Sequence, residues 1–382
     1  MLAFGQFIGW FCLVLAIGGT GFTLLAAGFV RPQPSGGRSD SDSGGQGPAT
    51  LLKPLHLAEP GLEDNLRSFL RQDYQWPIQV VFGVRSYADP ALQVVSRLKR
   101  EFPAADIDVV VDSKLGGSNP KIANLINMIG RARHDLLVLS DSDIRVETDY
   151  VRKIALALDE PDVGAVSCLY SGYPLGNMWS TLAAMGIDYQ FLPNARIGIA
   201  FGLTEPCFGS TIAMRRQTLT EIGGFEAVAN VLADDFELGR AIREMGYRLA
   251  IPALTVEHVC GQTSLAALFR QELRWAKTTL TLAGAGYGGT LVTFPLPLAL
   301  LAAWFLDFSP VSLGGIAAAL LSRTLLVVCS GRPVGPRAER LWLLPLRDVL
   351  SFGVFAASFF GRTVDWRGTR YLARADGALA QL

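Results

Sequence analysis

Apolar and polar positions divide this chain into apolar ends and an alternating middle. Residues 4–30 form a continuous apolar run, long enough to cross a bilayer. The run has no basic segment before it and is too long for a signal peptide, so we predict a retained membrane span. Arg31 follows at once and favours a cytoplasmic position for the next part of the chain. Residues 32–48 are rich in Pro, Gly, Ser and Asp, which predicts a flexible linker.

From residue 50 to about 276, short apolar runs alternate with segments whose apolar residues recur at helical spacing. This alternation indicates βαβ units and a mostly parallel sheet, in which ligands bind beyond the carboxyl ends of the strands. We therefore predict a Rossmann-like α/β domain over residues 50–276. Its expected strands are Thr50–Pro54, Ile78–Val84, Ile107–Val111 and Asp135–Leu139, and the helices between them are Leu62–Leu70, Pro90–Glu101 and Pro120–Arg131.

Beyond Trp275 the chain becomes apolar again. Two membrane helices are predicted within residues 289–330, at Leu291–Leu306 and Val311–Cys329. Arg323 lies inside the second of them, where it is costly unless it faces protein or reaches the interface.

Residues 341–361 form a third apolar segment, which is interrupted by Pro345, Arg347 and Asp348. This segment is predicted to span the membrane, re-enter it or lie in the interface. The loop before it is basic, as cytoplasmic loops are, with Arg332, Arg337 and Arg340. The tail, residues 362–382, has the aromatic and basic composition of an interfacial segment.

Composition narrows the class of protein. Half of the 382 residues are hydrophobic, which is too apolar for an ordinary soluble enzyme, and the middle is too charged for a bundle of spans alone. The net charge is zero, so no strong field indicates a nucleic-acid partner. The five cysteines lack zinc-site spacing and are odd in number, which favours reduced thiols and a soluble part facing the cytosol.

Two carboxylates, Asp141 and Asp143, follow the apolar strand that ends at Leu139. Mg²⁺ and Mn²⁺ prefer oxygen ligands and commonly bridge one or two carboxylates to substrate phosphates. The pair therefore predicts a metal site at the edge of the sheet. A solvated turn at the end of the strand is the structural alternative.

Two further acidic positions precede predicted helices. Asp89 stands before Pro90, so it is explained as a helix N-cap, and contact with a base or ribose is compatible with that role. Asp234 and Asp235 precede the helical pattern Phe236–Met245. N-capping and a general base that accepts a proton from an acceptor hydroxyl both remain open for this pair.

Gln271, Arg274 and Trp275 occur at i, i+3 and i+4 and share one helix face next to an apolar segment. Arg suits a diphosphate and Trp offers a flat platform for a sugar or lipid, although an interfacial helix has the same composition. Lys121 opens a predicted helix, where contact with a phosphate and plain solvation are both open. His56, His134 and His258 are interpreted as structural.

Together these motifs resemble the GT-A glycosyltransferases of family 2 and, more closely, family 21. The shared order is an Asp, an Asp-x-Asp-like motif, a further Asp, and Q-x-x-R-W before membrane segments. Similarity to ceramide glucosyltransferase-type enzymes lies in Leu52–Leu55, Ala88–Ala91, Asn119–Lys121, Asp141–Val146, Gln271–Trp275, Ser358–Arg362 and Trp366–Gly368. Bacterial hopanoid-biosynthesis glycosyltransferases are more similar still, through Leu136–Val146, Ala183–Pro193, Pro206–Ile212, Gly223–Phe225 and Glu257–Cys260.

The resemblance implies a role for each motif. Asp89 would contact the uracil or ribose of a UDP-sugar, and Asp141 and Asp143 would hold the diphosphate and a Mg²⁺ or Mn²⁺ ion. Asp235 would be the catalytic base. Lys121 is grouped with the donor-binding residues, and the diphosphate and acceptor would be bound by Gln271, Arg274 and Trp275.

The implied enzyme is an inverting, metal-dependent glycosyltransferase in the bacterial inner membrane, with a GT-A domain facing the cytoplasm. It would transfer N-acetylglucosamine from UDP-GlcNAc to bacteriohopanetetrol. Ceramide glucosylation with UDP-glucose is the alternative, although eukaryotic ceramide enzymes carry a His in the region of Gln190–Asn194, where this chain has none. A processive polysaccharide synthase would need a larger bundle of spans, and the intact acidic set disfavours a non-catalytic lipid-binding scaffold.

Overall fold

The computed structural model of the chain describes residues 2–30, 47–331, 338–361, 363–366, 369–373 and 379–381. The chain divides into two compact units. Unit 1 combines Met1–Pro32, Gly172–Thr204 and Gln262–Arg370, and unit 2 combines Gln33–Ser171, Glu205–Gly261 and Tyr371–Leu382. Several predictions fall outside the described residues, namely those on Arg31, most of the linker, Arg332, Arg337 and part of the tail.

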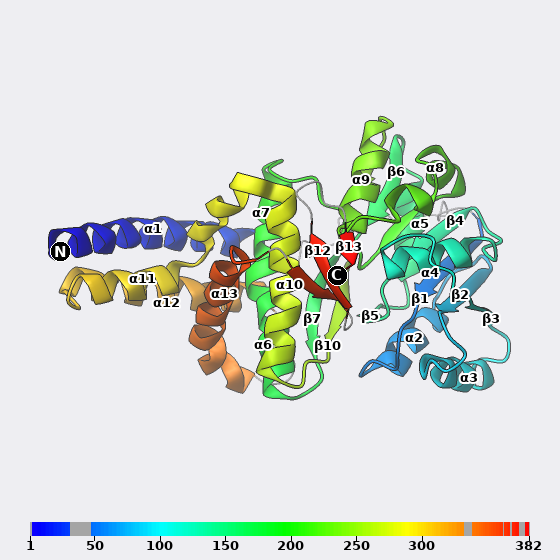
Figure 1. The fold of residues 1–382 in the computed structure, drawn as a ribbon, viewed down its shortest axis with the longest axis horizontal. Helices are drawn as coiled ribbons and strands as arrows, with labels where there is room; N and C mark the ends of the chain where they lie inside the picture. The colour runs from blue at the N-terminus through cyan, green and yellow to red at the C-terminus, as the bar shows by residue number, and fades with distance from the viewer. Residues whose placement is uncertain are drawn as a thin grey trace. The chain divides into compact units, whose positions relative to one another are not determined.

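A seven-stranded mixed sheet organises unit 2, in the order β3-β2-β1-β4-β8-β6-β9. Strands β1 to β4 and β6 of this sheet are labelled in Figure 1. The first four strands of the chain are parallel, and β8 runs antiparallel to both β4 and β6. The predicted α/β fold with a mostly parallel sheet is confirmed. The strands are β1 (Ala49–Pro54), β2 (Ile78–Val84), β3 (Asp106–Val111), β4 (Leu136–Leu139), β6 (Val163–Ser167), β8 (Ile212–Arg215) and β9 (Arg248–Ala250).

Both faces of this sheet are buried, which explains the nearly continuous apolar runs of its strands. In β1, Leu51 packs on one face and Leu52 on the other, and both are fully buried. Apolar residues of α2 (Leu62–Leu70), α3 (Ala91–Glu101) and α5 (Tyr150–Leu158) cover the first face. The second face is covered by residues of α4 (Pro120–Ile129), α8 (Arg216–Glu221), the 3₁₀ helix η2 (Phe225–Val228) and α9 (Asp234–Glu244).

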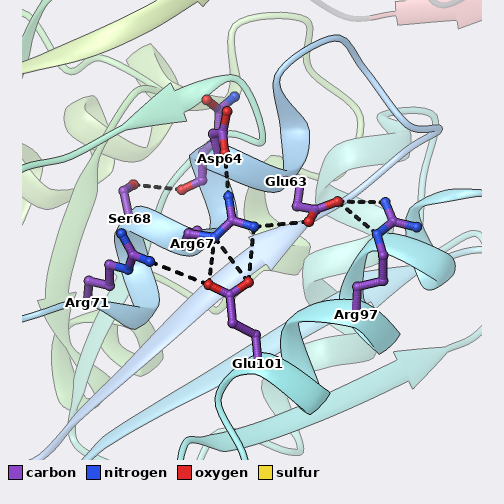
Figure 2. A network of polar contacts seen from close by, with 8 residues as sticks. Glu63, Asp64, Arg67, Ser68, Arg71, Arg97 and Glu101 are labelled. Carbon is purple, nitrogen blue, oxygen red and sulfur yellow. Dashed lines mark hydrogen bonds and ion pairs between the residues drawn. The ribbon is translucent and has the colours of Figure 1, made fainter.

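An ion-pair network joins α2 to α3 (Figure 2). The guanidinium of Arg67 in α2 donates to Glu101 at the end of α3 and to Glu63, one turn earlier in α2. Glu63 also accepts hydrogen bonds from Arg97 of α3. Partly exposed pairs of this kind contribute little to stability.

A smaller sheet has the order β5-β10-β7; β5 and β10 belong to unit 2, and β7 runs across the unit boundary at Gly172. Its strands are β5 (Ile144–Arg145), β7 (Leu169–Pro174) and β10 (Thr255–Cys260). β10 is antiparallel to β5, with His258 opposite Ile144. This pairing brings the His258 region beside the turn that follows β4. Because β1, β2 and β4 are parallel neighbours, the loops at their carboxyl ends lie at the same edge of the main sheet.

Unit 1 is mostly helical. Within the described part of the chain, three helices are long and apolar enough to cross a membrane: Ala3–Phe29, Pro310–Ser330 and Leu341–Ser358. These fit a membrane protein. The helical elements of the unit are α1 (Leu2–Phe29), α6 (Met178–Gly186), the π-helix η1 (Ile187–Phe191), α7 (Leu192–Ala200), α10 (Leu265–Ala283), the 3₁₀ helix η3 (Gly284–Thr293), α11 (Pro295–Phe305), α12 (Pro310–Ser330), the 3₁₀ helix η4 (Ala338–Leu343) and α13 (Leu344–Ser358).

The expected membrane helix Leu291–Leu306 differs from the structure. α11 has only 11 residues, and a 71° bend separates it from the helical segment Leu265–Thr293 before it. Two prolines explain the break, because Pro295 pushes Phe294 out of the helical region, to φ −115° and ψ 60°. The length of α11, roughly 16 Å, is about half of a bilayer's hydrocarbon core.

Small residues allow α1 to approach α11 and α12. Ala16 packs with Ala299 of α11 and Ala319 of α12. A Cβ at Gly19 would lie 2.2 Å from the carbonyl oxygen of Val292, so only glycine fits there. Close backbone approach of this kind is typical of helix packing in membranes. At the end of the chain, a three-stranded sheet forms from β11 (Thr363–Trp366), β12 (Thr369–Ala373) and β13 (Leu379–Gln381).

Candidate active site

The turn after β4 is fixed by the surrounding residues of unit 2. Lys53 of β1 donates from Nζ to the backbone carbonyl of Asp141 at 2.5 Å and to Ser140 Oγ at 3.2 Å. Asn65 Nδ2 donates to the carbonyl of Ser142, whose hydroxyl donates to Glu59. These contacts hold the turn from inside the protein and leave the carboxylates of its two aspartates partly exposed.

Lys121 connects the aspartates of two different loops. Its Nζ lies 2.9 Å from Asp141 Oδ1 and 3.0 Å from Asp234 Oδ2. The side chain is only 13% exposed, so the interpretation of Lys121 as a solvated lysine is wrong. Asn119 places it: Asn119 Oδ1 caps α4 by accepting from the backbone N–H of Lys121, and Asn119 Nδ2 donates to Asp234 Oδ1.

The carboxylates around Lys121 keep it charged. Burial alone would lower the pKa of this ammonium group. The charges of Asp141, Asp234 and Asp235 outweigh burial, and the pKa is raised above its usual value. A permanent positive charge therefore lies at the carboxyl edge of the sheet, within reach of three acidic side chains.

Asp235 lies at the start of α9 but does not cap that helix in the usual way. The N-cap position is Ala233, and no side-chain capping hydrogen bond is formed. Instead Asp235 Oδ2 accepts from the backbone N–H of Gly209 at 2.9 Å, and Oδ1 accepts from that of Phe236 at 2.8 Å. The N-capping interpretation of this pair is therefore wrong in its usual form.

The environment of Asp235 raises its pKa from 3.8 to about 6. Burial is the largest cause, and the neighbouring charge of Asp234 adds to it. Lys121 and the two backbone N–H groups lower the pKa and partly offset this rise. A carboxylate whose pKa approaches neutrality is suited to accept and release protons at physiological pH.

Gly209 lies at the centre of this cluster. A Cβ at this position would lie 3.1 Å from Lys121 Nζ, 3.2 Å from Asp141 Oδ2 and 3.4 Å from Asp235 Oδ2. A glycine here thus keeps a small space between three charged groups. The turn that contains Gly209 thus brings the backbone close to these three side chains.

Asp143 has an unsatisfied carboxylate oxygen. Its Oδ1 is buried and has no hydrogen-bond partner among the described residues. His258 Nδ1 lies 3.7 Å from this oxygen. Within the described part of the chain, no three His, Cys, Asp or Glu side chains come together to hold a metal. Asp141 and Asp143 still match a site in which a substrate diphosphate completes the coordination of Mg²⁺ or Mn²⁺.

Asp89 is held by backbone N–H groups. Both of its oxygens accept from Leu57 N, at 3.0 and 3.1 Å, and Oδ1 also accepts from Ala91 N at 2.9 Å. The hydrogen bond from Ala91 N satisfies a free N–H at the start of α3, although the N-cap position of that helix is Pro90 and not Asp89 as interpreted from the sequence. The hydrogen bonds from Leu57 N fix that residue at a φ of +60°, in the left-handed region. The carboxylate thus shapes the loop after β1.

Lys53 and Tyr170 were not singled out as functional candidates from the sequence, and His258, which was interpreted as structural, lies 3.7 Å from Asp143. Lys53 is fully buried over the ring of Phe69, and burial lowers its pKa to about 7 against the opposing effect of nearby carboxylates. The pKa of Tyr170 is raised by burial and then by Asp235, Asp143 and Asp141, so its hydroxyl is near the acidic cluster. A charged residue in the middle of an apolar strand was the one signal that pointed to Lys53.

Gln271, Arg274 and Trp275 belong to α10 of unit 1. All three are partly buried, and Gln271 Oε1 accepts a hydrogen bond from Gln262 Nε2 at 2.6 Å. Their helical spacing is as predicted. Within unit 2 the structure brings together Lys121, Asp141, Asp234 and Asp235, with Asp143 two residues from Asp141. Asp89 follows β2 at the same edge of the sheet, and β1 lies between β2 and β4.

Comparisons with known proteins identify the family of the chain. The family profile described as Glycosyl transferase family 21 matches residues 12–379. Ceramide glucosyltransferase 3 of Caenorhabditis elegans is 23% identical over 246 residues, which are 61% of this chain and 50% of that protein. An N-acetylglucosaminyltransferase of Rhizobium meliloti (strain 1021) is 27% identical over 240 residues, which are 60% of this chain and 55% of that protein. The chain spans about half the length of the curated relatives it matches.

Among solved structures, a mannosyltransferase from Pyrobaculum calidifontis in complex with GDP-Man and Mn²⁺ is similar in fold. The TM-score is 0.51 at 19% sequence identity, over 93% of this chain and 99% of that one. The similarity confirms the predicted GT-A-type fold and concerns the fold alone.

Proposed function

The chain belongs to glycosyltransferase family 21, and on that premise we propose that it transfers a sugar from a UDP-sugar to a hydroxyl group of a membrane lipid. Asp235 is the catalytic base. It accepts the proton of the acceptor hydroxyl, the oxygen attacks the anomeric carbon, and UDP leaves in a single displacement with inversion. No second carboxylate nucleophile is required.

One observation carries this proposal: the position of Asp235 among Gly209, Lys121 and Asp234. Its pKa of about 6 leaves it deprotonated at neutral pH and still basic enough to accept a proton in the transition state. The hydrogen bond from Gly209 N orients Oδ2 toward the space beside Lys121 and Asp141. Transfer from a nucleotide-sugar requires a base, a positive charge and a pair of carboxylates close together. Here these groups are Asp235, Lys121 and the pair Asp141 and Asp143 after β4.

Asp141 and Asp143 are proposed to hold Mg²⁺ or Mn²⁺ together with the donor diphosphate. The unsatisfied buried oxygen of Asp143 supports this role. When bound, such an ion neutralises charge on the departing diphosphate as a Lewis acid. Lys121 adds a fixed positive charge beside Asp141, and Asp89 shapes the loop proposed to contact the uracil or ribose.

Gln271, Arg274 and Trp275 are proposed to bind the diphosphate and the acceptor. Guanidinium geometry matches diphosphate oxygens, and an indole face suits a sugar or lipid surface. The chain is further proposed to lie in the bacterial inner membrane with the α/β unit facing the cytoplasm, and the three apolar helices support the insertion in a membrane.

The donor and acceptor are proposed to be UDP-GlcNAc and bacteriohopanetetrol. Similarity to an N-acetylglucosaminyltransferase supports the donor, and the resemblance to hopanoid-biosynthesis enzymes supports the acceptor. The second candidate is ceramide glucosylation with UDP-glucose, which the similarity to ceramide glucosyltransferases favours.

The proposal is tested by assaying the purified full chain with UDP-GlcNAc and UDP-glucose against bacteriohopanetetrol and ceramide, in all four combinations. The mass of the lipid product identifies both substrates. Transfer of N-acetylglucosamine to bacteriohopanetetrol supports the first candidate, and glucosylceramide supports the second. Absence of UDP binding and of any product would instead favour a non-catalytic scaffold.

A further inference from the structure

Two consecutive residues of α13 form buried ion pairs with two different helices. Arg347 donates from Nη1 and Nη2 to the two carboxylate oxygens of Glu272 in α10, both at 2.7 Å. Asp348 accepts from Nη2 and Nε of Arg323 in α12, at 2.7 and 2.9 Å. All four side chains are at most 12% exposed. A single turn of α13 therefore holds both α10 and α12.

Arg347 is enclosed on every side within unit 1. Its guanidinium also donates to Ser351 Oγ, at 3.0 and 2.8 Å, and to the carbonyl of Leu182 in α6 at 3.2 Å. A Cβ at Gly186 of α6 would lie 2.8 Å from its Cζ, so a glycine leaves the space that the guanidinium fills. The side chain has one well-defined position, set by three helices.

Glu272 lies within the Gln271–Trp275 motif but on a different face of α10. It shares its face with Ala276 and Leu280, which pack against the aromatic cluster of α13 at Phe352 and Phe355. At 100° per residue this face and the face of Gln271, Arg274 and Trp275 are separated by roughly 150°. Glu272 itself is roughly 100° from Gln271, 160° from Arg274 and 60° from Trp275, so the carboxylate that α13 holds does not share the direction of the three proposed ligand-binding side chains.

We propose that Arg347 is a positioning residue that fixes the rotation of α10 through Glu272, and so sets the direction of Gln271, Arg274 and Trp275. The proposal rests on the proposed function, which gives those three side chains their role in binding UDP and the acceptor. Arg347 itself touches neither substrate. The ion pair with Glu272 fixes the rotation of α10, because a bidentate pair restricts both the distance and the angle between the guanidinium and the carboxylate.

Stability alone does not explain the pair. Charged residues within an apolar segment are expensive, and a buried ion pair is often no more stabilising than apolar residues of the same volume. The pair of Arg347 and Glu272 instead supplies a fixed distance and angle at one point of contact between α13 and α10. Asp348 and Arg323 provide the matched comparison, because they are equally buried and equally bidentate but hold α12 instead of α10.

The test measures UDP binding in the presence of Mn²⁺ by calorimetry, with the full chain in detergent. The variants are Arg347→Gln and Glu272→Gln, and the control is Asp348→Asn. Glu272→Gln retains the shape of the side chain. Its UDP affinity decides the test if Arg347→Gln does not fold. Thermal unfolding of each variant reports the loss of stability separately.

We expect Arg347→Gln and Glu272→Gln to weaken UDP binding by about tenfold or more, as misplacement of a binding group does. Asp348→Asn is expected to lower Tm by a similar amount but to retain the UDP affinity of the wild type. Equal losses of affinity in all three variants, or no loss in any, would overturn the positioning role. If the wild type itself fails to bind UDP, the proposed function fails instead.

Discussion

The backbone N–H of Gly209 donates a 2.9 Å hydrogen bond to Oδ2 of Asp235. The same glycine leaves open the space between Asp235, Lys121 and Asp141. A single residue without a side chain therefore both orients the proposed base and keeps room beside it. This relationship makes Gly209 a sensitive probe of the site, although it carries no reactive group.

Gly209→Ala is expected to lower kcat/KM about tenfold or more, because small displacements of catalytic groups cost that much. The new Cβ would press on Lys121 Nζ at 3.1 Å and on Asp141 Oδ2 at 3.2 Å. Backbone strain is not the cause, because Gly209 is not among the residues with positive φ. Steady-state kinetics and Tm are measured together. Unchanged kinetics with an unchanged Tm would show that the space is not used.

The pH dependence of kcat/KM follows from the raised pKa of Asp235. A base acts only when deprotonated, so kcat/KM should rise with pH through about 6 and level off above it. Below the midpoint the slope should approach tenfold per pH unit, as expected for one ionising group. The profile is measured with saturating metal. A midpoint near 4, the ordinary value for an aspartate, would contradict the account of this site.

Lys121 tests the cause of that pKa. Its positive charge lowers the pKa of Asp235, so Lys121→Met should move the midpoint of the pH profile upward. The variant also leaves the carboxylates of Asp141 and Asp234 without a counter-ion, at a cost of about 3 kcal/mol in the free energy of unfolding. Lys121→Arg keeps the charge and serves as the control. If both variants share the wild-type midpoint, Lys121 does not tune the base.

Metal removal tests the role of the turn after β4. We expect EDTA to abolish transfer and Mn²⁺ or Mg²⁺ to restore it. Asp143→Asn should raise the metal concentration needed for half-maximal activity by about tenfold or more, because one carboxylate ligand is lost. Asp64→Asn, which removes a carboxylate from the exposed network of Figure 2, is the control. Full activity in EDTA would exclude a metal-dependent site.

The sheet of unit 2 was largely predictable because local signals agree with the tertiary structure. Strands buried on both faces are continuous apolar runs, and the helices between them have a clear apolar face, so the four predicted strands differ from β1–β4 by at most one residue at each end. The break before α11 was not predicted, since the apolar run through Pro295 and Pro297 has the composition of a single span.

Within the site, residue types were predictable and their partners were not. The sequence placed Asp141 and Asp143 after a strand, but it contained nothing that joined Lys121 to both Asp141 and Asp234, which are more than ninety residues apart in the chain. The same holds for Glu272 and Arg347. Long-range pairs of this kind depend on tertiary packing, whereas helix caps and strand ends depend on local sequence.

Replacement of Asp235 is the measurement that tests the proposed mechanism most directly. Asp235→Asn retains the shape of the side chain and removes its basicity. Burial of a carboxylate whose pKa is raised destabilises the fold above that pKa, so the neutral variant should be at least as stable as the wild type at pH 8, and the difference should vanish below about pH 4. Any loss of activity then reflects chemistry and not unfolding.

We predict that Asp235→Asn lowers turnover by about 10²- to 10⁴-fold, the usual contribution of a general base. Glu244→Gln, an exposed carboxylate near the other end of α9, should keep the wild-type rate. Turnover is measured with UDP-GlcNAc and bacteriohopanetetrol, and folding is checked by circular dichroism. A correctly folded Asp235→Asn protein with near-native turnover would contradict the central claim that Asp235 is the base.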